Sequence, residues 1–289
     1  MVRRRIAKNF LKKEDFIKKR ENPVSSRISR FESWSGRLLK MIDVHCHLEQ
    51  KDYDKDREEV IKKCREKMKA VISSSPHKDD FNTAIDLHNK YSGFVYICLG
   101  LHPMYIRELS EKDILNSISF IRRHKDELSA VGEVGLDYYH VKEKEWQDKQ
   151  KEMFRRFIRL AKELNKPLVI HCRDAFEDTI KILEEEKAEK VMFHLFGDKK
   201  SCSKVLDNGW FISIGPLLLR SKTIKKIARF MPLERIMLET DSPWFGFGER
   251  GTPLNVIKTA EKIAEVKKAT ITEVEEQTDL NARNFFKID

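Results

Sequence analysis

Long apolar runs are missing from this chain. No stretch of about 18 apolar residues occurs, which is the length that a membrane-spanning helix needs. The basic N-terminus has no apolar core of the kind that a secretory signal carries, so we expect no signal peptide. Cysteine pairs are missing as well. The chain has five cysteines and no Cys-x-x-Cys spacing, and an odd number in 289 residues indicates reduced thiols in a cytoplasmic protein.

An excess of charge of one sign is absent from the body of the chain, although the net charge of the whole is +10. Residues 1–40 hold 13 of the 57 Lys and Arg and 4 of the 47 Asp and Glu, which leaves 44 basic and 43 acidic residues in 41–289. Basicity is therefore no argument for a nucleic-acid surface on the body. We interpret residues 1–40 as a disordered basic N-terminal extension, and a basic arm that attracts phosphates is the alternative.

Short apolar segments alternate with helical patterns from residue 41 onward. The predicted strands are 41–47, 70–72, 94–99, 130–133, 167–171, 191–194, 210–214 and 235–241. Ser110-x-x-Asp113 and Thr272-x-x-Glu275 are typical of capping boxes that begin helices. Eight β/α units in roughly 250 residues predict an α/β fold, with a closed (β/α)₈ TIM-type barrel over 41–289. A doubly wound open sheet is the alternative.

Metal-binding residue types stand at the carboxyl ends of five predicted strands. His45 and His47 share one face of the first strand, because successive side chains alternate, and Cys46 turns away. In a (β/α)₈ barrel all such strand ends meet at one mouth, where active sites lie. The candidate ligands at this mouth are His45, His47, Glu133, His171, His194 and Asp241.

Six ligands are too many for one tetrahedral ion with an open position, and they suit two ions that share a bridge. A carboxylate can span both ions, and Glu133 is the natural candidate. Paired ions lower the pKa of a bound water and neutralise charge on the attacking and leaving oxygens. Asp241 could be both ligand and proton acceptor. The residues alone therefore predict a metal-dependent hydrolase with Glu133 and Asp241 as catalytic residues, and they leave the cleaved bond open.

Most other polar residues near the mouth allow two interpretations, one functional and one structural. Asp43, on the same predicted face as His45, and Asp137 could each orient an imidazole or be a buried structural acid. Glu239 lies deeper in its strand, and we interpret it as structural. His102 and Arg173 are candidates for substrate contacts, with a local role and an ion pair as the respective alternatives. The remaining histidines are expected at the surface: His77, His88, His124 and His140.

Seven short motifs occur in order along 41–289: MIDVHCHL at 41–48, GLHP at 100–103, GEVGLDYY at 132–139, VIHCRDA at 169–175, FHLF at 193–196, LETDSP at 238–243 and NARNFF at 281–286. Through these motifs the chain resembles the TatD-type deoxyribonucleases of the metal-dependent hydrolase superfamily. The resemblance implies a (β/α)₈ barrel, two divalent metal ions and hydrolysis of phosphodiester bonds in DNA, commonly as an exonuclease. The DNA partner would be single-stranded or would offer a 3′ end, and no membrane partner is expected.

Carried over by position, the resemblance implies that His45, His47, Glu133 and Asp241 surround one metal ion. Glu133, His171 and His194 would hold the other, and a metal-activated water would attack phosphorus. The sequence leaves the metal open between Mg²⁺, Mn²⁺ and Zn²⁺, with Fe²⁺ and Ni²⁺ also compatible with imidazole ligands.

Three departures from the family pattern lie where loops would shape the substrate pocket. Leu195-Phe196-Gly197-Asp198 replaces the usual Cys-Phe-Ser-Gly, Met104 stands where a histidine is common, and the segment after Pro243 lacks the usual Asn-x-Pro order. The metal chemistry is therefore predicted more firmly than the DNA substrate. Two alternatives stay open: an amidohydrolase-like enzyme acting on a small ester, lactone or cyclic amide, and a non-catalytic scaffold that binds nucleic acid.

Overall fold

The strands of the barrel run in one direction and pair in chain order. The computed structural model describes residues 39–288, and its sheet is ordered from β1 to β8 with every neighbouring pair parallel. The strands are β1 Ile42–Cys46, β2 Ala70–Ser75, β3 Val95–Leu99, β4 Leu128–Asp137, β5 Leu168–Arg173, β6 Val191–Phe193, β7 Phe211–Ile214 and β8 Ile236–Leu238. The sequential order confirms the predicted (β/α)₈ barrel, because a doubly wound sheet reverses its order partway. The extension predicted over 1–40 lies outside the described residues, apart from 39 and 40.

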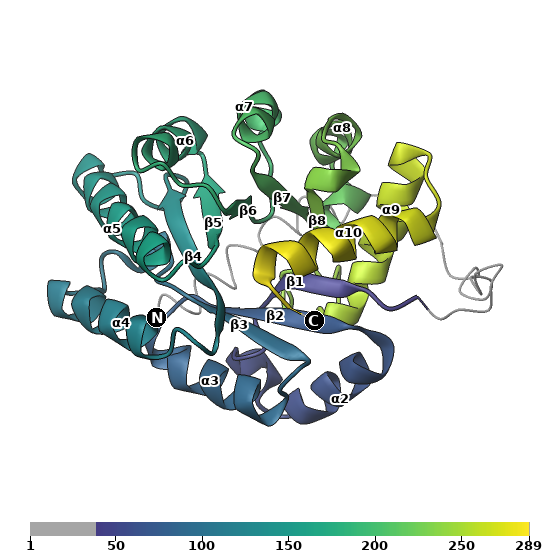
Figure 1. Ribbon diagram of the computed structural model, residues 1–289, viewed down its shortest axis with the longest axis horizontal. Coiled ribbons are helices and arrows are strands. Elements are labelled where there is room, and N and C mark those ends of the chain that lie inside the picture. The colour runs from purple at the N-terminus through teal and green to yellow at the C-terminus, as the bar shows by residue number, and fades with distance from the viewer. Residues whose placement is uncertain (1–38, 289) are drawn as a thin grey trace.

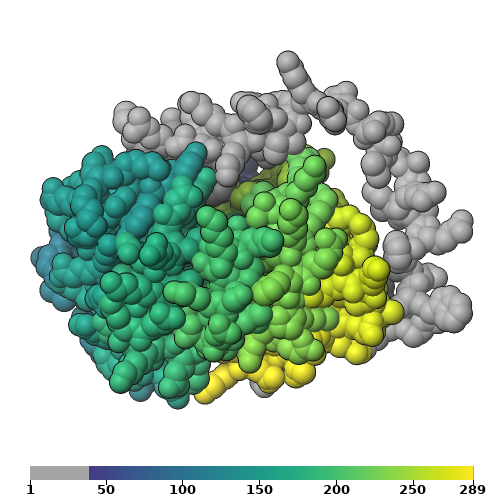
Figure 2. All heavy atoms as spheres, turned by 90° about the horizontal axis from the view of Figure 1, so that it is seen from above, coloured from purple at the N-terminus to yellow at the C-terminus, as the bar shows by residue number. Residues whose placement is uncertain are grey.

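Helices separate the strands and surround them (Figure 1). They are α2 Arg57–Lys67, α3 Phe81–Lys90, α4 Glu111–Arg123, α5 Lys144–Glu163, α6 Phe176–Glu185, α7 Cys202–Asp207, α8 Lys222–Phe230, α9 Val256–Lys267 and α10 Ile271–Phe286. Figure 2 shows that consecutive parts of the chain occupy neighbouring sectors of the molecule, from teal through green to yellow. Within residues 39–288, none of the helices has both the length and the apolar character of a membrane span.

Two of the helix starts test the predicted capping boxes. At α4, the hydroxyl of Ser110 accepts a hydrogen bond from the backbone N–H of Asp113 (3.1 Å), and the Asp113 carboxylate accepts one from the Ser110 N–H (3.0 Å), as predicted. At α10 the box is formed by Thr270 and Glu273, so the prediction of Thr272 and Glu275 was wrong by two residues.

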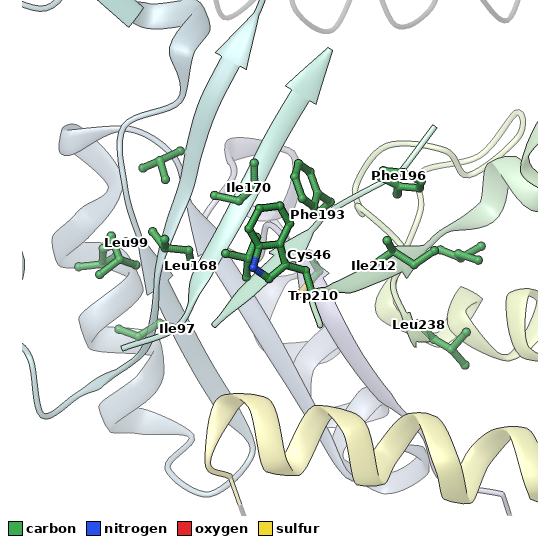
Figure 3. Close-up of a cluster of buried hydrophobic side chains, with 14 of the residues drawn as sticks. Cys46, Ile97, Leu99, Leu168, Ile170, Phe193, Phe196, Trp210, Ile212 and Leu238 are labelled. Atoms are coloured by element: carbon green, nitrogen blue, oxygen red, sulfur yellow. The ribbon is translucent and has the colours of Figure 1, made fainter. Parts of the chain in front are cut away.

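Alternate strand residues belong to two separate apolar clusters. Leu168 and Ile170 of β5 belong to the cluster between strands and helices, which includes the side chains that Figure 3 shows around Trp210. Val169 belongs to the inner cluster, with residues such as Ala70 and Ala130. This alternation is what a barrel requires, because one face of each strand lines the interior and the other packs against helices.

The last helix, α10, completes the barrel at the end opposite the candidate site. Phe285 and Phe286 join the inner cluster. No ladder joins β8 to β1 among the strand pairings of the described chain. Instead the Asp279 carboxylate accepts a hydrogen bond from the Ile42 N–H (3.1 Å), and the Asn281 amide donates to the carbonyl of Ile236 (2.8 Å). Side chains of α10, which lies beside β1 in Figure 1, thus replace missing backbone bonds at this seam.

Candidate metal centre

His45 in β1 and His47 directly after it reach the mouth through an irregularity in the strand. The register against β2 shifts between Asp43 and Cys46, so three steps along β1 match two along β2. The extra residue turns His45 and His47 toward the barrel axis, while the Cys46 thiol faces the Ile72 carbonyl (3.5 Å). The shared face predicted for the two histidines is confirmed by their Nε2 atoms, which lie 3.2 Å apart.

Asp43 has a structural environment. Its carboxylate accepts hydrogen bonds from the backbone N–H groups of His45 (3.2 Å) and Thr240 (3.0 Å) and from the Thr240 hydroxyl (2.5 Å). These bonds connect β1 to the segment after β8, where the Asp241 N–H also donates to the His45 carbonyl (2.9 Å). Of the two readings, orienting an imidazole and being a buried structural acid, the geometry favours the second. The pKa of Asp43 is raised well above its usual value, chiefly by burial.

Glu133 is the extra residue of an irregularity in β4. Gly132 pairs with Val169 and Val134 with Ile170, so Glu133 has no partner in β5 and its side chain enters the barrel. Glycine at position 100 makes room for this geometry. A Cβ there would lie 2.7 Å from the Gly132 carbonyl carbon and 2.8 Å from the Glu133 oxygen. The local backbone thus depends on a missing side chain directly after the neighbouring strand β3.

The first group of side chains contains His45, His47 and Asp241. Asp241 Oδ1 lies 3.1 Å from His47 Nε2 and 3.5 Å from His45 Nε2. Glu133 Oε2 lies 3.5 Å from His45 Nε2 and 4.0 Å from His47 Nε2. All four residues are buried.

The second group surrounds the other oxygen of the same glutamate. Glu133 Oε1 lies 2.8 Å from His194 Nε2, 2.9 Å from His171 Nδ1 and 3.3 Å from His102 Nε2. His171 Nδ1 and His194 Nε2 are 3.3 Å apart. The structure therefore brings all six predicted ligands together, with the two oxygens of Glu133 turned to different groups.

These nitrogen and oxygen atoms are better arranged to bind a cation than to hydrogen-bond with one another. A hydrogen on Nε2 of His47 can bond to Asp241 or to His45, but not to both, although both lie within 3.2 Å. In the second group two imidazole nitrogens and a carboxylate oxygen converge within 3.3 Å. Clusters of imidazole nitrogens and carboxylate oxygens are the usual makings of divalent metal sites.

Three further carboxylates lie behind the histidines, and one of them, Asp137, is within hydrogen-bond distance of its imidazole. Asp137 Oδ2 lies 3.0 Å from His171 Nε2, Glu239 Oε2 lies 3.6 Å from His194 Nδ1, and Glu49 Oε1 lies 3.4 Å from His47 Nδ1. Each acid favours a hydrogen on the outer nitrogen, so the lone pair of the inner nitrogen is directed at the centre. Asp137 thus has the orienting role that was one of its two readings.

The positions of two of these acids behind histidines were not predicted from the sequence. Glu239 was interpreted as purely structural. It does accept a hydrogen bond from the Leu195 N–H (2.6 Å), but its other oxygen faces His194. Glu49 was not singled out, although a buried acid two residues after a His-x-His strand end is a signal that could have found it.

His102 is a hydrogen-bond donor in this arrangement. Its Nδ1 accepts the backbone N–H of Met104 (3.1 Å), so in the neutral ring the hydrogen is on Nε2, which faces Glu133. Burial, aided by the neighbouring His171, lowers the pKa of His102 to about 4, so the ring is neutral near pH 7. A neutral ring with this tautomer offers Glu133 a donor and offers a metal no lone pair.

The charges of the centre follow from burial and from opposite charges. Burial alone would raise the pKa of Glu133, but His194 and His102 hold it well below its usual range. Burial would lower the pKa of His47, yet Asp241 and Glu49 raise it to about 10. Glu133 is therefore ionised, and cations compete with protons for the imidazoles around it.

The remaining predicted residues lie around this centre. Arg173 stacks its guanidinium over the Tyr139 ring, 3.9 Å from the centroid, at the rim of the mouth. The surface location predicted for four histidines was wrong for His77, which is buried, and incomplete for His140, whose Nδ1 lies 2.9 Å from the Asp137 carboxylate. His88 and His124 are partly exposed.

Comparisons with known proteins identify the family of the chain. The family model of the TatD related DNases matches residues 42–287. The human Deoxyribonuclease TATDN3 is 37% identical over 258 residues, which cover 85% of this chain and 94% of the human protein. A metal-dependent hydrolase of Methanocaldococcus jannaschii is 34% identical over 254 residues, with 87% of this chain and 98% of the archaeal protein covered.

Solved structures share the fold. The crystal structure of the TatD homolog YJJV of Escherichia coli superposes with a TM-score of 0.80 at 21% identity and covers 88% of this chain and 100% of its own. A TatD family hydrolase of Entamoeba histolytica gives a TM-score of 0.78 at 23% identity, over 86% of this chain and 99% of its own.

Proposed function

The chain belongs to the TatD related DNase family of metal-dependent hydrolases, and from this premise we propose that it hydrolyses phosphodiester bonds of DNA at the mouth of its barrel. The observation that carries the proposal is the position of Glu133. Its two oxygens face two groups of donors, 2.8 Å from His194 Nε2 on one side and 3.5 Å from His45 Nε2 on the other. A carboxylate so placed suits two cations, which is the arrangement that phosphodiester hydrolysis uses.

We assign the donors to two divalent ions. His45, His47 and Asp241 with Glu133 would hold one, and Glu133 with His171 and His194 would hold the other. When bound, the ions would supply an activated water and would neutralise charge on the phosphate oxygens. Nitrogen-rich donors suit Mn²⁺ or Zn²⁺, and phosphate chemistry favours Mg²⁺.

The chain's own residues would hold the substrate and move protons. Asp241 would accept the proton that the attacking water loses, because its carboxylate lies at the mouth beside His47. His102 keeps Glu133 ionised by donating from Nε2. Arg173 at the rim would bind a phosphate oxygen, since a guanidinium presents a rigid set of donors to such groups.

The substrate assignment takes support from the family. The human relative is named a deoxyribonuclease. We propose a single-stranded or 3′-terminal DNA segment, cleaved from the end, which is the substrate that the resemblance of the motifs to the family implies. The hydrolase domain would comprise residues 41–289, with residues 1–40 as an N-terminal extension.

A cleavage assay on end-labelled single-stranded DNA tests the proposal. The full chain would be incubated with Mg²⁺, Mn²⁺ or Zn²⁺, beside a chelator-treated sample and Asp241→Asn. We expect metal-dependent shortening that the variant reduces at least about a hundredfold, because general-base catalysis contributes that much. The order in which products appear would give the polarity.

The opposite result would be informative. If the folded wild type, loaded with each metal, leaves DNA intact, the nuclease proposal fails. Hydrolysis of a small ester or cyclic amide would then favour the amidohydrolase-like alternative. Many relatives of that kind bridge their metals with a modified lysine, and the glutamate at position 133 weighs against them.

A further inference from the structure

The connection between β8 and α9 forms a tight loop beside the candidate metal centre. Its base is held by backbone bonds from the Trp244 N–H to Asp241 (3.1 Å) and from the Gly251 N–H to Pro243 (2.8 Å), and the Tyr53 hydroxyl donates to the Gly251 carbonyl (2.7 Å). A Cβ at position 251 would lie 2.4 Å from the Trp244 carbonyl oxygen, so the two arms of the loop are packed together.

This anchored loop presents aromatic rings at the mouth. The Trp244 ring meets the His47 imidazole edge-on, with centroids 4.6 Å apart. Three residues later the Phe247 ring lies under the guanidinium of Arg220, which is 4.1 Å from its centroid. Trp244 and Phe247 are partly exposed and Arg220 is exposed, so rings and cation are accessible from solvent.

The backbone of the loop is unusual for aromatic residues. Phe245 and Phe247 both have φ of 56°, in the left-handed region that bulky side chains rarely adopt. Such conformations cluster at ligand clamps, where the surrounding structure holds them in place. The segment after Pro243 also lacks the Asn-x-Pro order that is usual in the family. Its aromatic residues are therefore a feature of this chain and not part of the motifs that it shares with the family.

An exposed ring paired with an arginine suits a nucleotide. Bases stack on aromatic faces, and arginine binds the adjoining phosphate while it covers a ring. A second pair is Tyr139, two residues after β4, with Arg173 at the end of β5. In an eight-stranded barrel β4 lies opposite β8, so Tyr139 and Phe247 follow strands on opposite sides of the mouth.

We propose that Trp244, Phe247 and Arg220 form a nucleotide-binding site that stacks one base next to the scissile phosphodiester and contacts the phosphate beyond it. This inference rests on the proposed function and deepens it, because it assigns the chemistry that distinguishes a nucleic-acid strand from a small phosphodiester. Substrate would then lie on both sides of the centre, with the Tyr139 pair holding the nucleotide on the other side.

The test compares two substrates in wild type and variants. One is a labelled single-stranded thymidine dodecamer, and the other is methyl p-nitrophenyl phosphate, which has no nucleobase. We expect Phe247→Leu to raise KM for the dodecamer about fivefold to a hundredfold more than it raises KM for the small diester. Stacking of one base on an aromatic ring accounts for a factor of this size. Phe247→Tyr keeps a stacking face and should restore the wild-type KM.

Two further variants separate the ring from the loop. Phe247→Gly removes the ring and relieves the left-handed backbone, so it should lose dodecamer binding as Phe247→Leu does. Arg220→Gln should reduce the slope of log KM against log salt by roughly 0.7, since one phosphate contact on a single strand is lost. Phe230→Leu is the matched control, because Phe230 is 51% exposed at the far end of α8 and should leave both substrates unaffected.

The outcomes are distinguishable. If Phe247→Gly keeps the wild-type KM for the dodecamer, or if Phe247→Leu and Phe230→Leu have equal effects on it, the proposal of a stacking site is wrong. The nuclease assignment would still stand. If wild type hydrolyses the small diester and leaves the dodecamer intact, the proposed function fails and this inference fails with it.

Discussion

Single side chains decide whether the mouth of the barrel can hold cations. Asp137, Glu239 and Glu49 face the outer nitrogens of three histidines, so the inner lone pairs converge on Glu133. The buried acids of the site thus have two roles, since some are proposed metal ligands and others position histidines. This is why the site contains more buried acids than two cations need as ligands. An acid that faces an imidazole fixes its orientation and its tautomer without binding metal itself.

Substitution of the bridging residue tests the two-ion assignment. In Glu133→Gln the side chain keeps its size but offers one neutral oxygen acceptor, so it cannot join two cations. We expect the metal content after equilibrium dialysis to fall from two ions per chain to one or fewer, measured by atomic emission. Glu143→Gln, at the exposed start of α5, serves as the control. Two ions retained by Glu133→Gln would contradict the bridge.

At the residue scale, the rule that strand ends meet at one mouth predicted which side chains the structure brings together. His45, His47, Glu133, His171, His194 and Asp241 all follow from that rule. The roles of His102 and His140 did not follow, because they depend on contacts across the chain. His102 is oriented by the Met104 N–H, and His140 reaches Asp137 through a turn that no periodic pattern marks.

At the scale of elements, irregularities in β1 and β4 direct His45, His47 and Glu133 into the mouth. The shift in β4 places Glu133 in the barrel, and there is room for it because residue 100, directly after β3, has no side chain. Strand periodicity alone cannot predict such a shift, since an inserted residue reverses the faces of everything beyond it.

A methyl group at position 100 should therefore displace β4. In Gly100→Ala the new Cβ would meet the backbone of Gly132 and Glu133 at 2.7 to 2.9 Å, so either strand must move. We expect the free energy of unfolding to fall by about 1–3 kcal/mol and turnover to fall at least about tenfold, from urea titration and the DNA assay. Gly197→Ala is the control, because its Cβ would meet nothing closer than 3.8 Å. Unchanged turnover in Gly100→Ala would contradict this role of the glycine.

The helix α10 also contributes through particular side chains. The Asn281 amide donates to the carbonyls of Leu233 (2.9 Å) and Ile236 (2.8 Å) at the seam between β8 and β1. Asn281→Ala should lower the free energy of unfolding by about 1–3 kcal/mol, because a buried carbonyl loses its donor. Asn284→Ala on the exposed face of the same helix should change it by no more than about 0.5 kcal/mol. If both variants change the free energy of urea unfolding equally, the hydrogen bonds of Asn281 at the seam do not contribute to stability.

The start of α10 shows the limit of local patterns. Thr270 with Glu273 and Thr272 with Glu275 both match a capping box. Glu275 is instead buried and accepts hydrogen bonds from the Lys40 N–H (3.1 Å) and the Lys69 ammonium (3.1 Å). The choice between the two boxes thus depended on tertiary contacts with the start of β1 and β2, which lie far away in sequence.

On the scale of the whole molecule, the fold was predictable because eight similar units repeat the same pattern. Short apolar strands, amphipathic helices and strand-end ligands all indicate one architecture, and such agreement between levels is what makes a sequence specify a fold. The closure of the barrel was not predictable. It uses Asp43, Asp279 and Asn281 in place of a regular ladder, and no periodicity distinguishes Asp279 and Asn281 from surface residues.

Metal binding should stabilise the entire barrel, since the proposed ligands come from β1, β4, β5 and the segments after β6 and β8. Cations that join these elements bind the folded chain alone, so unfolding must release them. At a free metal concentration of about 100 times Kd this linkage amounts to roughly 2.7 kcal/mol per site. We expect a chelator to lower the midpoint of thermal unfolding by several degrees in differential scanning calorimetry, and Glu133→Gln to reduce that difference. A wild type whose unfolding midpoint is the same with and without divalent metal would mean that these side chains hold no cation in the folded protein.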